Sequence, residues 1–213
     1  MELAVLRDNL GYQGLLLGAA ALLTSALLSL ADRVTAPAIE AAEARDLTAS
    51  LRQVLPEGFD NDPLSDRVTV PGADGEVTVW RARQGGLIEG VAFRVTGKGY
   101  AGRIVCLLGV DPDGRILGVR VLKHTETPGL GDKIEPAKDD WIHAFAGRFL
   151  GDPPAERWGV KKDGGTFDHF TGATITPRAV VEAVRDGLTL FAAQRSAMLS
   201  DGPKRDLAAN ERK

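Results

Sequence analysis

An uncharged, largely apolar run lies near the start of the chain, and short β-rich runs follow only after residue 66. Residues 14–30 contain only Gly, Leu, Ala, Thr and Ser, and the uncharged stretch 10–31 is bounded by Asp8 and Asp32. About 20 such residues span the hydrocarbon core of a membrane. A buried core helix would carry a polar stripe, and this run has none. We therefore expect residues 1–33 to form a transmembrane anchor.

A cleaved signal peptide is the main alternative for this run. Signal peptides usually have a shorter apolar region followed at once by a small-x-small cleavage site. The nearest candidate site, residues 36–38, is spoiled by Pro37. The charge bias does not decide the orientation, because Arg7 precedes the run and three arginines follow it, Arg33, Arg45 and Arg52. The long polar remainder is the kind of domain that translocates whatever its charge.

Residues 34–66 are expected to hold a connecting helix and a linker. Residues 35–55 are rich in Ala, Glu, Arg and Leu, which favours a helix, and Pro56 and Gly58 end it.

Short β-rich runs then follow one another with little between them. They cover residues 68–70, 76–82, 87–95, 104–110 and 115–122. Asp111–Gly114 separates the last two and favours a turn, because Pro presets φ and Gly accepts a positive φ. Short connections of this kind indicate an antiparallel meander.

Two helical patterns complete a domain expected over residues 67–198. Trp141, Phe145 and Phe149 are helically spaced within 139–149. A second helix is predicted from Pro177 to about Ala197, with Thr176 as its N-cap. Its apolar stripe is that of a helix lying on a sheet, Val180, Val184, Leu188 and Phe191. The fold class is therefore α+β behind one membrane helix, and the charged tail 199–213 is expected to be disordered.

Composition excludes several function classes. The formal net charge of −3 provides no basic field for nucleic acid. The only cysteine, Cys106, lies in an apolar strand pattern and is expected to be buried. His124, His143 and His169 lack the spacing of a metal site, and no motif for a catalytic nucleophile is present.

The segment before the last predicted helix carries the clearest chemistry. Thr171–Thr174 are all small residues just upstream of the predicted cap Thr176, so a phosphate can approach their backbone and the positive end of the helix dipole. Lys161 lies in the preceding loop and can add positive charge. These residues alone indicate an anion site or an ordinary capped loop.

Two motifs resemble those of one protein family. Residues 168–174, Asp-His-Phe-Thr-Gly-Ala-Thr, fit the Asp-x-x-(Ser/Thr)-Gly-Ala-Thr pattern of proteins to which a flavin transferase attaches FMN through a phosphoester. Residues 124–131, His-Thr-Glu-Thr-Pro-Gly-Leu-Gly, resemble a second loop of the same FMN-binding domain. From about residue 10 to about residue 195 the chain resembles the G-subunit family of Rnf (Rsx) ion-translocating electron-transport complexes. The C subunit of the sodium-translocating NADH:quinone reductase is a relative.

The resemblance implies the roles of individual residues. Thr174 is the expected attachment point, and Thr171 and Thr176 offer hydroxyls to the phosphate. The other cofactor-binding residues it implies are Gly172, Ala173, Lys161, Glu126, Thr127, Pro128, Gly129, Leu130 and Gly131, with Leu130 against the isoalloxazine. For Glu126 and Asp168 we expect a structural role in fixing their loops rather than an acid pair.

The resemblance also implies a function. It predicts a single-pass protein of the bacterial inner membrane with its FMN domain on the periplasmic side. There it relays electrons within a complex that links ferredoxin and NAD redox chemistry to ion movement. Its partners are the other subunits and a flavin transferase, and it needs no catalytic residue of its own. Two alternatives are a membrane-anchored FMN-binding sensor or regulatory module, and a flavin reductase acting alone.

Overall fold

The structure is a computed structural model of the whole chain, and it describes residues 10–73 and 75–200. The chain divides into two compact units, Met1–Leu47 and Thr48–Lys213. The prediction of a disordered tail falls mostly on residues 201–213, which lie outside the described residues.

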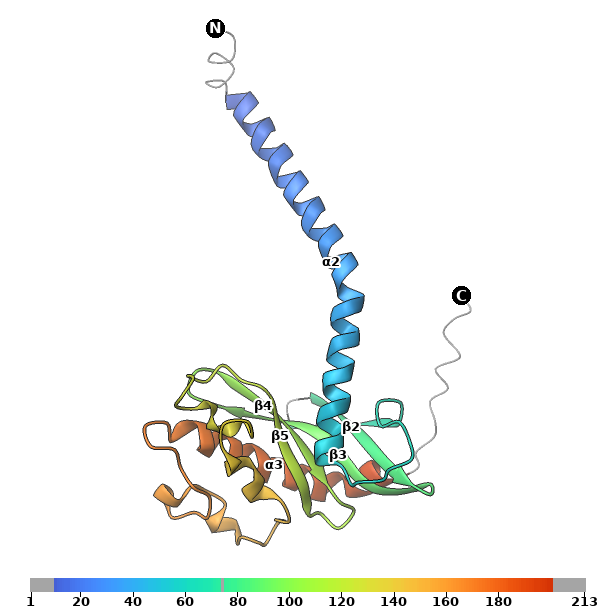
Figure 1. Cartoon of the computed structure of the whole chain (residues 1–213), viewed down its shortest axis with the longest axis vertical. Coiled ribbons are helices and arrows are strands. Elements are labelled where there is room, and N and C mark those ends of the chain that lie inside the picture. The colour runs from blue at the N-terminus through green and yellow to red at the C-terminus, as the bar shows by residue number, and fades with distance from the viewer. Residues whose placement is uncertain (1–9, 74, 201–213) are drawn as a thin grey trace. The chain divides into compact units, whose positions relative to one another are not determined.

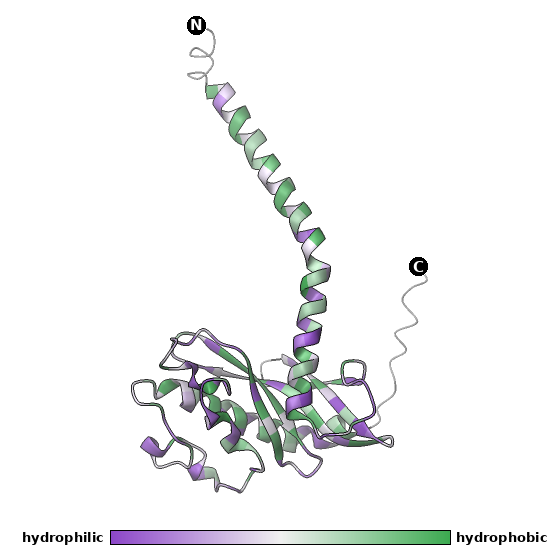
Figure 2. Ribbon diagram, in the orientation of Figure 1, coloured by the Kyte–Doolittle hydropathy of each residue, from purple (hydrophilic) through white to green (hydrophobic). Residues whose placement is uncertain are grey.

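One helix, α2 (Leu10–Val54), contains both the apolar run and the connecting helix. It continues through Pro37, although proline removes one intrahelical hydrogen bond. Figure 2 shows the first part of α2 dominated by hydrophobic residues and the second part by a mixture. The helix is long and apolar enough to cross a membrane, and its apolar window is fully exposed in the structure. A core helix would be mostly buried, so these properties fit the expected anchor.

The predicted antiparallel meander is confirmed (Figure 1). Five strands lie in the order in which they occur along the chain, and each pairs antiparallel with the next. They are β1 (Arg67–Gly72), β2 (Gly75–Gln84), β3 (Leu87–Lys98), β4 (Arg103–Val110) and β5 (Ile116–Lys123). The turn between the last two forms as expected, with Gly114 at φ 90° and its N–H donated to the Asp111 carbonyl at 3.1 Å.

The two faces of the sheet are covered by different helices. On β4, Ile104, Cys106 and Leu108 point into the core shared with α3 (Ile175–Leu199). The alternate positions meet the last residues of α2, where a Cβ on Gly109 would lie 1.8 Å from the Val54 carbonyl oxygen. Figure 1 shows α3 behind the sheet and the end of α2 in front of it. The second unit is therefore a helix–sheet–helix sandwich.

The helical predictions need two corrections. Residues 139–149 do not form an α-helix, because only a short 3-10 helix, η2 (Asp140–Phe145), is present. Thr176 is not the N-cap of α3, because the helix begins at Ile175 and Thr176 is buried inside its first turn. The predicted apolar stripe of α3 is confirmed, since Val180, Val184, Leu188 and Phe191 are all buried.

Three further 3-10 turns lie in the long connection between β5 and α3. They are η1 (Asp132–Ile134), η3 (Ala155–Arg157) and η4 (Lys161–Asp163).

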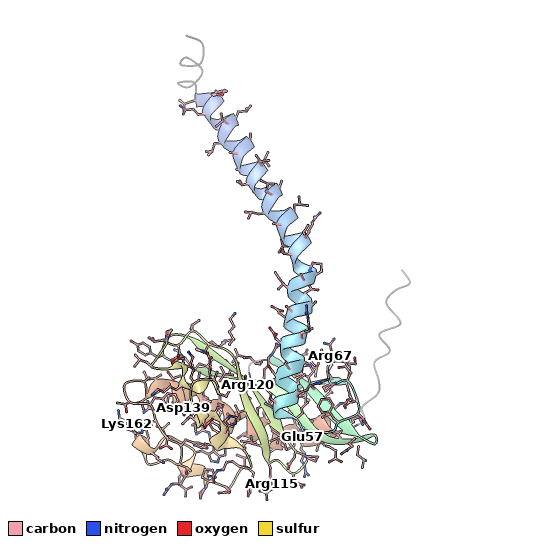
Figure 3. All side chains as sticks on the ribbon, in the orientation of Figure 1. Glu57, Arg67, Arg115, Arg120, Asp139 and Lys162 are labelled. Carbon is pink, nitrogen blue, oxygen red and sulfur yellow. The ribbon has the colours of Figure 1, made fainter. Side chains whose placement is uncertain are left out.

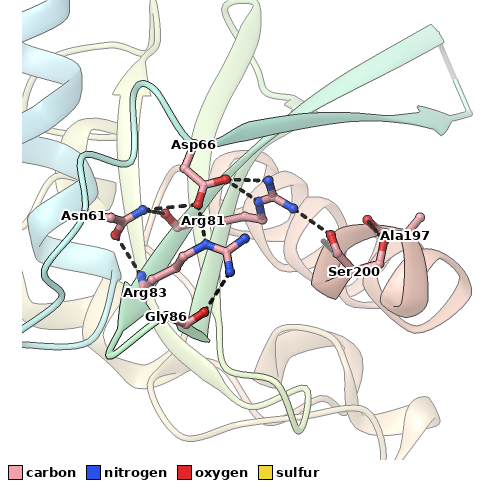
Figure 4. A network of polar contacts seen from close by, with 7 residues as sticks. All are labelled: Asn61, Asp66, Arg81, Arg83, Gly86, Ala197 and Ser200. Carbon is pink, nitrogen blue, oxygen red and sulfur yellow. Dashed lines mark hydrogen bonds and ion pairs between the residues drawn. The ribbon is translucent and has the colours of Figure 1, made fainter. Parts of the chain in front are cut away.

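A polar cluster joins the linker after α2 to β2 and the end of α3 (Figure 4). Asp66 accepts from Arg81 Nε at 2.7 Å and from Arg83 Nε at 2.5 Å. Arg81 also donates to the Ser200 carbonyl oxygen at 2.8 Å. Because the guanidinium groups are paired with one carboxylate and with backbone, this cluster stabilises the fold and does not present a free anion site.

Candidate functional site

The loop that follows β5 is fixed at both ends by one imidazole. His124 Nδ1 accepts a hydrogen bond from the Glu126 backbone N–H at 3.1 Å, and Nε2 lies 2.6 Å from Glu135 Oε1. Since Nδ1 accepts, the ring proton sits on Nε2 and is donated to Glu135. His124 therefore holds the start of the loop 126–131 to the chain that follows η1.

The loop itself is a tight turn with an open outer surface. The Thr127 carbonyl oxygen accepts from the N–H groups of Leu130 and Gly131 at 3.2 and 3.1 Å. Gly129 has φ 79°, and its N–H donates to Asp132 Oδ1 at 2.8 Å. A Cβ on Gly129 would meet nothing within 4 Å. The turn therefore leaves room for a flat group to approach its backbone.

The second motif is held from beneath by aromatic side chains. Phe170 is buried, and its ring lies 5.2 Å from that of Trp141 in an edge-to-face arrangement. Trp141 Nε1 donates to the Asp168 carbonyl oxygen at 2.9 Å, while the Asp168 carboxylate pairs with Lys161 Nζ at 2.7 Å. Figure 3 shows Asp139 and Lys162 on the loops at the end of the domain where α3 begins. These contacts set the course of the chain into Thr171–Thr174.

Glu126 joins the first motif to α3, which directly follows the second motif, and to a third segment. Its carboxylate is buried and accepts a short hydrogen bond from the Thr176 hydroxyl in α3. Its other oxygen accepts from the Ala101 N–H at 3.0 Å, in the turn between β3 and β4. A Cβ on Gly99 would lie 2.4 Å from that oxygen, and one on Gly131 would lie 2.9 Å from Glu126 Cβ. The glycines thus allow three segments to close around one carboxylate.

The two motifs also come close to each other on the outer surface of the domain, at Leu130 and Gly172. A Cβ on Gly172, which has φ 84°, would lie 3.8 Å from Leu130 Cδ2. Thr171 and Gly172 are exposed, whereas Ala173 and Thr174 are half-buried. The hydroxyl of Thr174 makes no capping bond to the helix. An uncommitted, partly exposed hydroxyl therefore stands at the N-terminus of α3.

The structure separates the predicted site residues by role. Glu126, Gly131 and Thr176 meet beneath the surface, which supports the expected structural role of Glu126. The Thr176 hydroxyl is committed to Glu126, so here it positions the helix rather than facing outward. Leu130 and Gly172 meet at the surface. The Lys161 ammonium pairs with the Asp168 carboxylate. The backbone carbonyl of Thr127 accepts the two hydrogen bonds that form the turn.

Sequence reasoning missed the turn Gly99–Gly102 and the support from Trp141. The turn is glycine-rich, with Gly99 and Gly102 flanking Tyr100 and Ala101. That spacing was a signal of close backbone approach, and here it brings Ala101 to Glu126. Nothing in the sequence around Trp141 connects it to Asp168.

The residues present fit a phosphate-linked flavin. The first turn of α3 has backbone N–H groups without intrahelical partners and the positive end of the helix dipole, both of which suit a phosphodiester. Thr174 supplies an uncommitted hydroxyl, and the surface at Gly129 is open.

Comparison with known proteins covers both motifs. The model of the FMN-binding domain family matches residues 99–189, which begin at the turn beside Glu126 and end within α3. The G subunit of the ion-translocating oxidoreductase complex of Cereibacter sphaeroides is 55% identical over 194 residues, covering 90% of this chain and 89% of the relative. Its counterpart in Stutzerimonas stutzeri is 48% identical over 193 residues, covering 90% and 85%. Among solved structures, Shewanella oneidensis NqrC aligns with 65% of this chain and 75% of its own, at 25% identity and a TM-score of 0.45.

Proposed function

Because the chain belongs to the family of G subunits of ion-translocating oxidoreductase complexes, we propose that it serves such a complex as a membrane-anchored electron-transfer subunit with FMN bound covalently to Thr174. The observation that carries the attachment point is the uncommitted Thr174 hydroxyl at the start of α3. In this proposal the complex links ferredoxin and NAD redox chemistry to ion movement.

Thr174 suits the attachment better than the two neighbouring threonines. Thr176 is fully buried and bonded to Glu126. Thr171 is exposed but lies before the turn at Gly172, further from the N–H groups of α3. A phosphodiester on Thr174 keeps one negative charge, which the N-terminus of α3 stabilises by about 0.3–1 kcal/mol at an exposed site.

The attachment is a phosphoryl transfer, and it needs an activated donor. The Thr174 oxygen attacks the flavin-side phosphorus of a flavin dinucleotide held by a flavin transferase. The new bond joins that oxygen to phosphorus, the pyrophosphate bond breaks, and the mononucleotide leaves. The transferase takes up the hydroxyl proton, so this chain needs only to present the hydroxyl on an accessible loop.

Once attached, FMN supplies the ability to accept and pass on electrons one or two at a time. The protein's part is to hold and surround the cofactor. Thr171 and the N–H groups of α3 bind the phosphate, while the turn Thr127–Gly131 offers an open backbone surface to the ring. Glu126 keeps these two segments at a fixed separation.

The attachment is tested by producing the chain with its flavin transferase and viewing a denaturing gel under ultraviolet light. We expect a fluorescent band that Thr174→Val abolishes and Thr171→Val retains. The intact mass should rise by one FMN increment in the unmodified chain and in Thr171→Val only. A band that survives Thr174→Val would assign the attachment to another residue.

The proposal places the FMN domain on the periplasmic side of the inner membrane, with α2 as the single span. The support is the apolar window of α2 and the size of the polar domain that follows it. Protease added to intact spheroplasts should digest the domain, while a cytoplasmic marker stays protected. Protection of the domain until the membrane is permeabilised would contradict the orientation.

A further inference from the structure

Five large apolar side chains are exposed within residues 48–73 and 75–200: Leu87, Tyr100, Leu130, Leu150 and Ile175. Single exposed apolar residues are ordinary, but a group of them on one part of the surface marks a place where something binds. Three of the five belong to the segments that Glu126 holds together.

Each of these three immediately precedes a residue packed against Glu126. Tyr100 precedes Ala101, whose N–H binds the carboxylate, and Ile175 precedes Thr176, whose hydroxyl binds it. Leu130 precedes Gly131, which lies too close to Glu126 to carry a side chain. The exposed fractions are 74% for Tyr100, 47% for Leu130 and 44% for Ile175. One buried carboxylate therefore fixes the backbone positions of three exposed apolar residues.

This group is next to the proposed attachment point. Ile175 follows Thr174 directly, and Leu130 Cδ2 lies 3.8 Å from the position that a Cβ on Gly172 would take. The surface at Gly129, the residue before Leu130, is open, because a Cβ there would meet nothing within 4 Å. A group tethered to Thr174 is thus held at high local concentration beside this apolar surface.

We propose that Tyr100, together with Leu130 and Ile175, forms the apolar wall that receives the isoalloxazine ring of the flavin attached to Thr174. This inference rests on the proposed function and adds Tyr100 and Ile175 to the residues that contact the cofactor. Tyr100 supplies an aromatic face, and aromatic pairs attract each other beyond the area they bury. The flavin is the chosen occupant because it is flat, aromatic and tethered within reach.

The test measures whether the ring rests on Tyr100 in the folded chain. The full chain and its variants are produced with the flavin transferase, and a denaturing gel first scores the covalent attachment. Visible circular dichroism and fluorescence of the native protein then report how far the ring is docked. Tyr100→Ala should leave the gel band unchanged. It should reduce the population of molecules with the ring docked about 2- to 10-fold, which is the change in equilibrium that the loss of one aromatic contact produces. Its fluorescence should move toward that of the unfolded, flavinylated chain.

Matched variants separate this role from others. Tyr100→Phe keeps an aromatic face and should retain the circular dichroism band, while Ile175→Ala should weaken it. Leu87→Ala removes a similarly exposed side chain elsewhere and should change nothing. Native spectra of Tyr100→Ala identical to those of the unmodified chain would overturn the proposal. So would loss of the chain from the assembled complex with unchanged flavin spectra, since Tyr100 would then contact a different protein of the complex. Absence of the gel band in the unmodified chain would overturn the proposed function and this inference with it.

Discussion

The hydroxyl of Thr176 donates a hydrogen bond to the buried carboxylate of Glu126, which lies 50 positions earlier in the chain. This bond links the first turn of α3 to the loop that follows β5. Because the same carboxylate also accepts from Ala101, three segments that are distant in sequence share one buried acceptor. The geometry of the proposed flavin site therefore depends on a residue beneath the surface.

Replacing Glu126 should loosen this arrangement. Glu126→Ala leaves the Ala101 N–H and the Thr176 hydroxyl without their acceptor, and an unsatisfied buried polar group costs about 1–3 kcal/mol. We expect the free energy of unfolding to fall by at least about 2 kcal/mol, and flavin attachment to slow, because Thr174 precedes the displaced turn. Urea denaturation and a time course of the fluorescent gel band measure the two effects.

Glu182→Ala is the control for this change, since Glu182 lies on α3 but is exposed. It should alter neither quantity. Thr176→Val combined with Glu126→Ala should destabilise by less than the sum of the two single changes, because both remove the same hydrogen bond. Full additivity would show that the two residues are not coupled.

Gly131 and Gly129 should respond differently to alanine, although both lie in the same turn. Gly131 has an ordinary φ of −92°, but an added Cβ would lie 2.9 Å from both Glu126 Cβ and Thr176 Oγ1. Overpacking of this kind costs about 1–3 kcal/mol. A Cβ on Gly129 would have open space, but the residue has a φ of 79°. Alanine at this φ introduces backbone strain of about 1–2 kcal/mol.

The midpoint of thermal unfolding and the rate of flavin attachment are measured for Gly131→Ala and Gly129→Ala. We expect Gly131→Ala to slow attachment and Gly129→Ala to leave the rate of attachment largely unchanged, because only the first displaces Glu126 and Thr176. Equal attachment rates for Gly131→Ala and the unmodified chain would show that these contacts relax without moving Thr174.

The last turn of α2 should be part of the folded domain, whereas its apolar part should not. Leu51 and Val54 are the only buried residues in the described length of α2, and Val54 covers the sheet at Gly109 and Gly118. Deletion of residues 1–33 should leave the denaturation midpoint unchanged. Deletion of residues 1–56 should lower stability by several kcal/mol, at about 1.5–3 kcal/mol for each buried Leu or Val. Equal midpoints for the two truncated chains would contradict this division.

Cys106 should be chemically inert in the folded protein. Burial raises the pKa of the Cys106 thiol from its ordinary value of 9.0 to about 12. The folded chain should therefore resist iodoacetamide at pH 8, while the urea-unfolded chain should react, because only the thiolate is a nucleophile. Rapid labelling of the folded chain would contradict its burial under α3.

The same shift predicts a pH dependence of stability. Above pH 9.0 the unfolded thiol releases its proton while the folded one keeps it up to a pKa of about 12, so the unfolded state binds fewer protons. Stability should therefore fall as the pH rises through this window. Cys106→Ala should remove that part of the decline, which denaturation curves at pH 8 and 10.5 measure.

Much of the fold followed from local sequence patterns. Short β-rich runs predicted all five strands, and the Asp111–Gly114 turn predicted how the last two connect. The apolar run predicted a helix long enough for a membrane. These predictions succeed because each depends on the conformational preferences of a few consecutive residues. The 139–149 helix failed because apolar residues at helical spacing pack equally well from a 3-10 turn and a loop.

The composition of the candidate site was also available from sequence, since the two motifs name most of its residues. The roles of the individual residues within the site could not be predicted from the sequence. Thr176 has the chemistry of a helix cap, but its hydroxyl turns to Glu126 because that buried carboxylate needs a donor. Tyr100 carries no motif, and it joins the site only because the turn between β3 and β4 reaches Glu126.

The sequence by itself determined the strands, the apolar helix and the two motifs of the candidate site, because short segments encode these. Tertiary structure alone decided that Glu126 binds Ala101 and Thr176 at once, and that the end of α2 covers the sheet at Gly109. Such contacts form between segments far apart in the chain. Their partners are selected by the packing of the sheet and helices as a whole, which no local pattern contains.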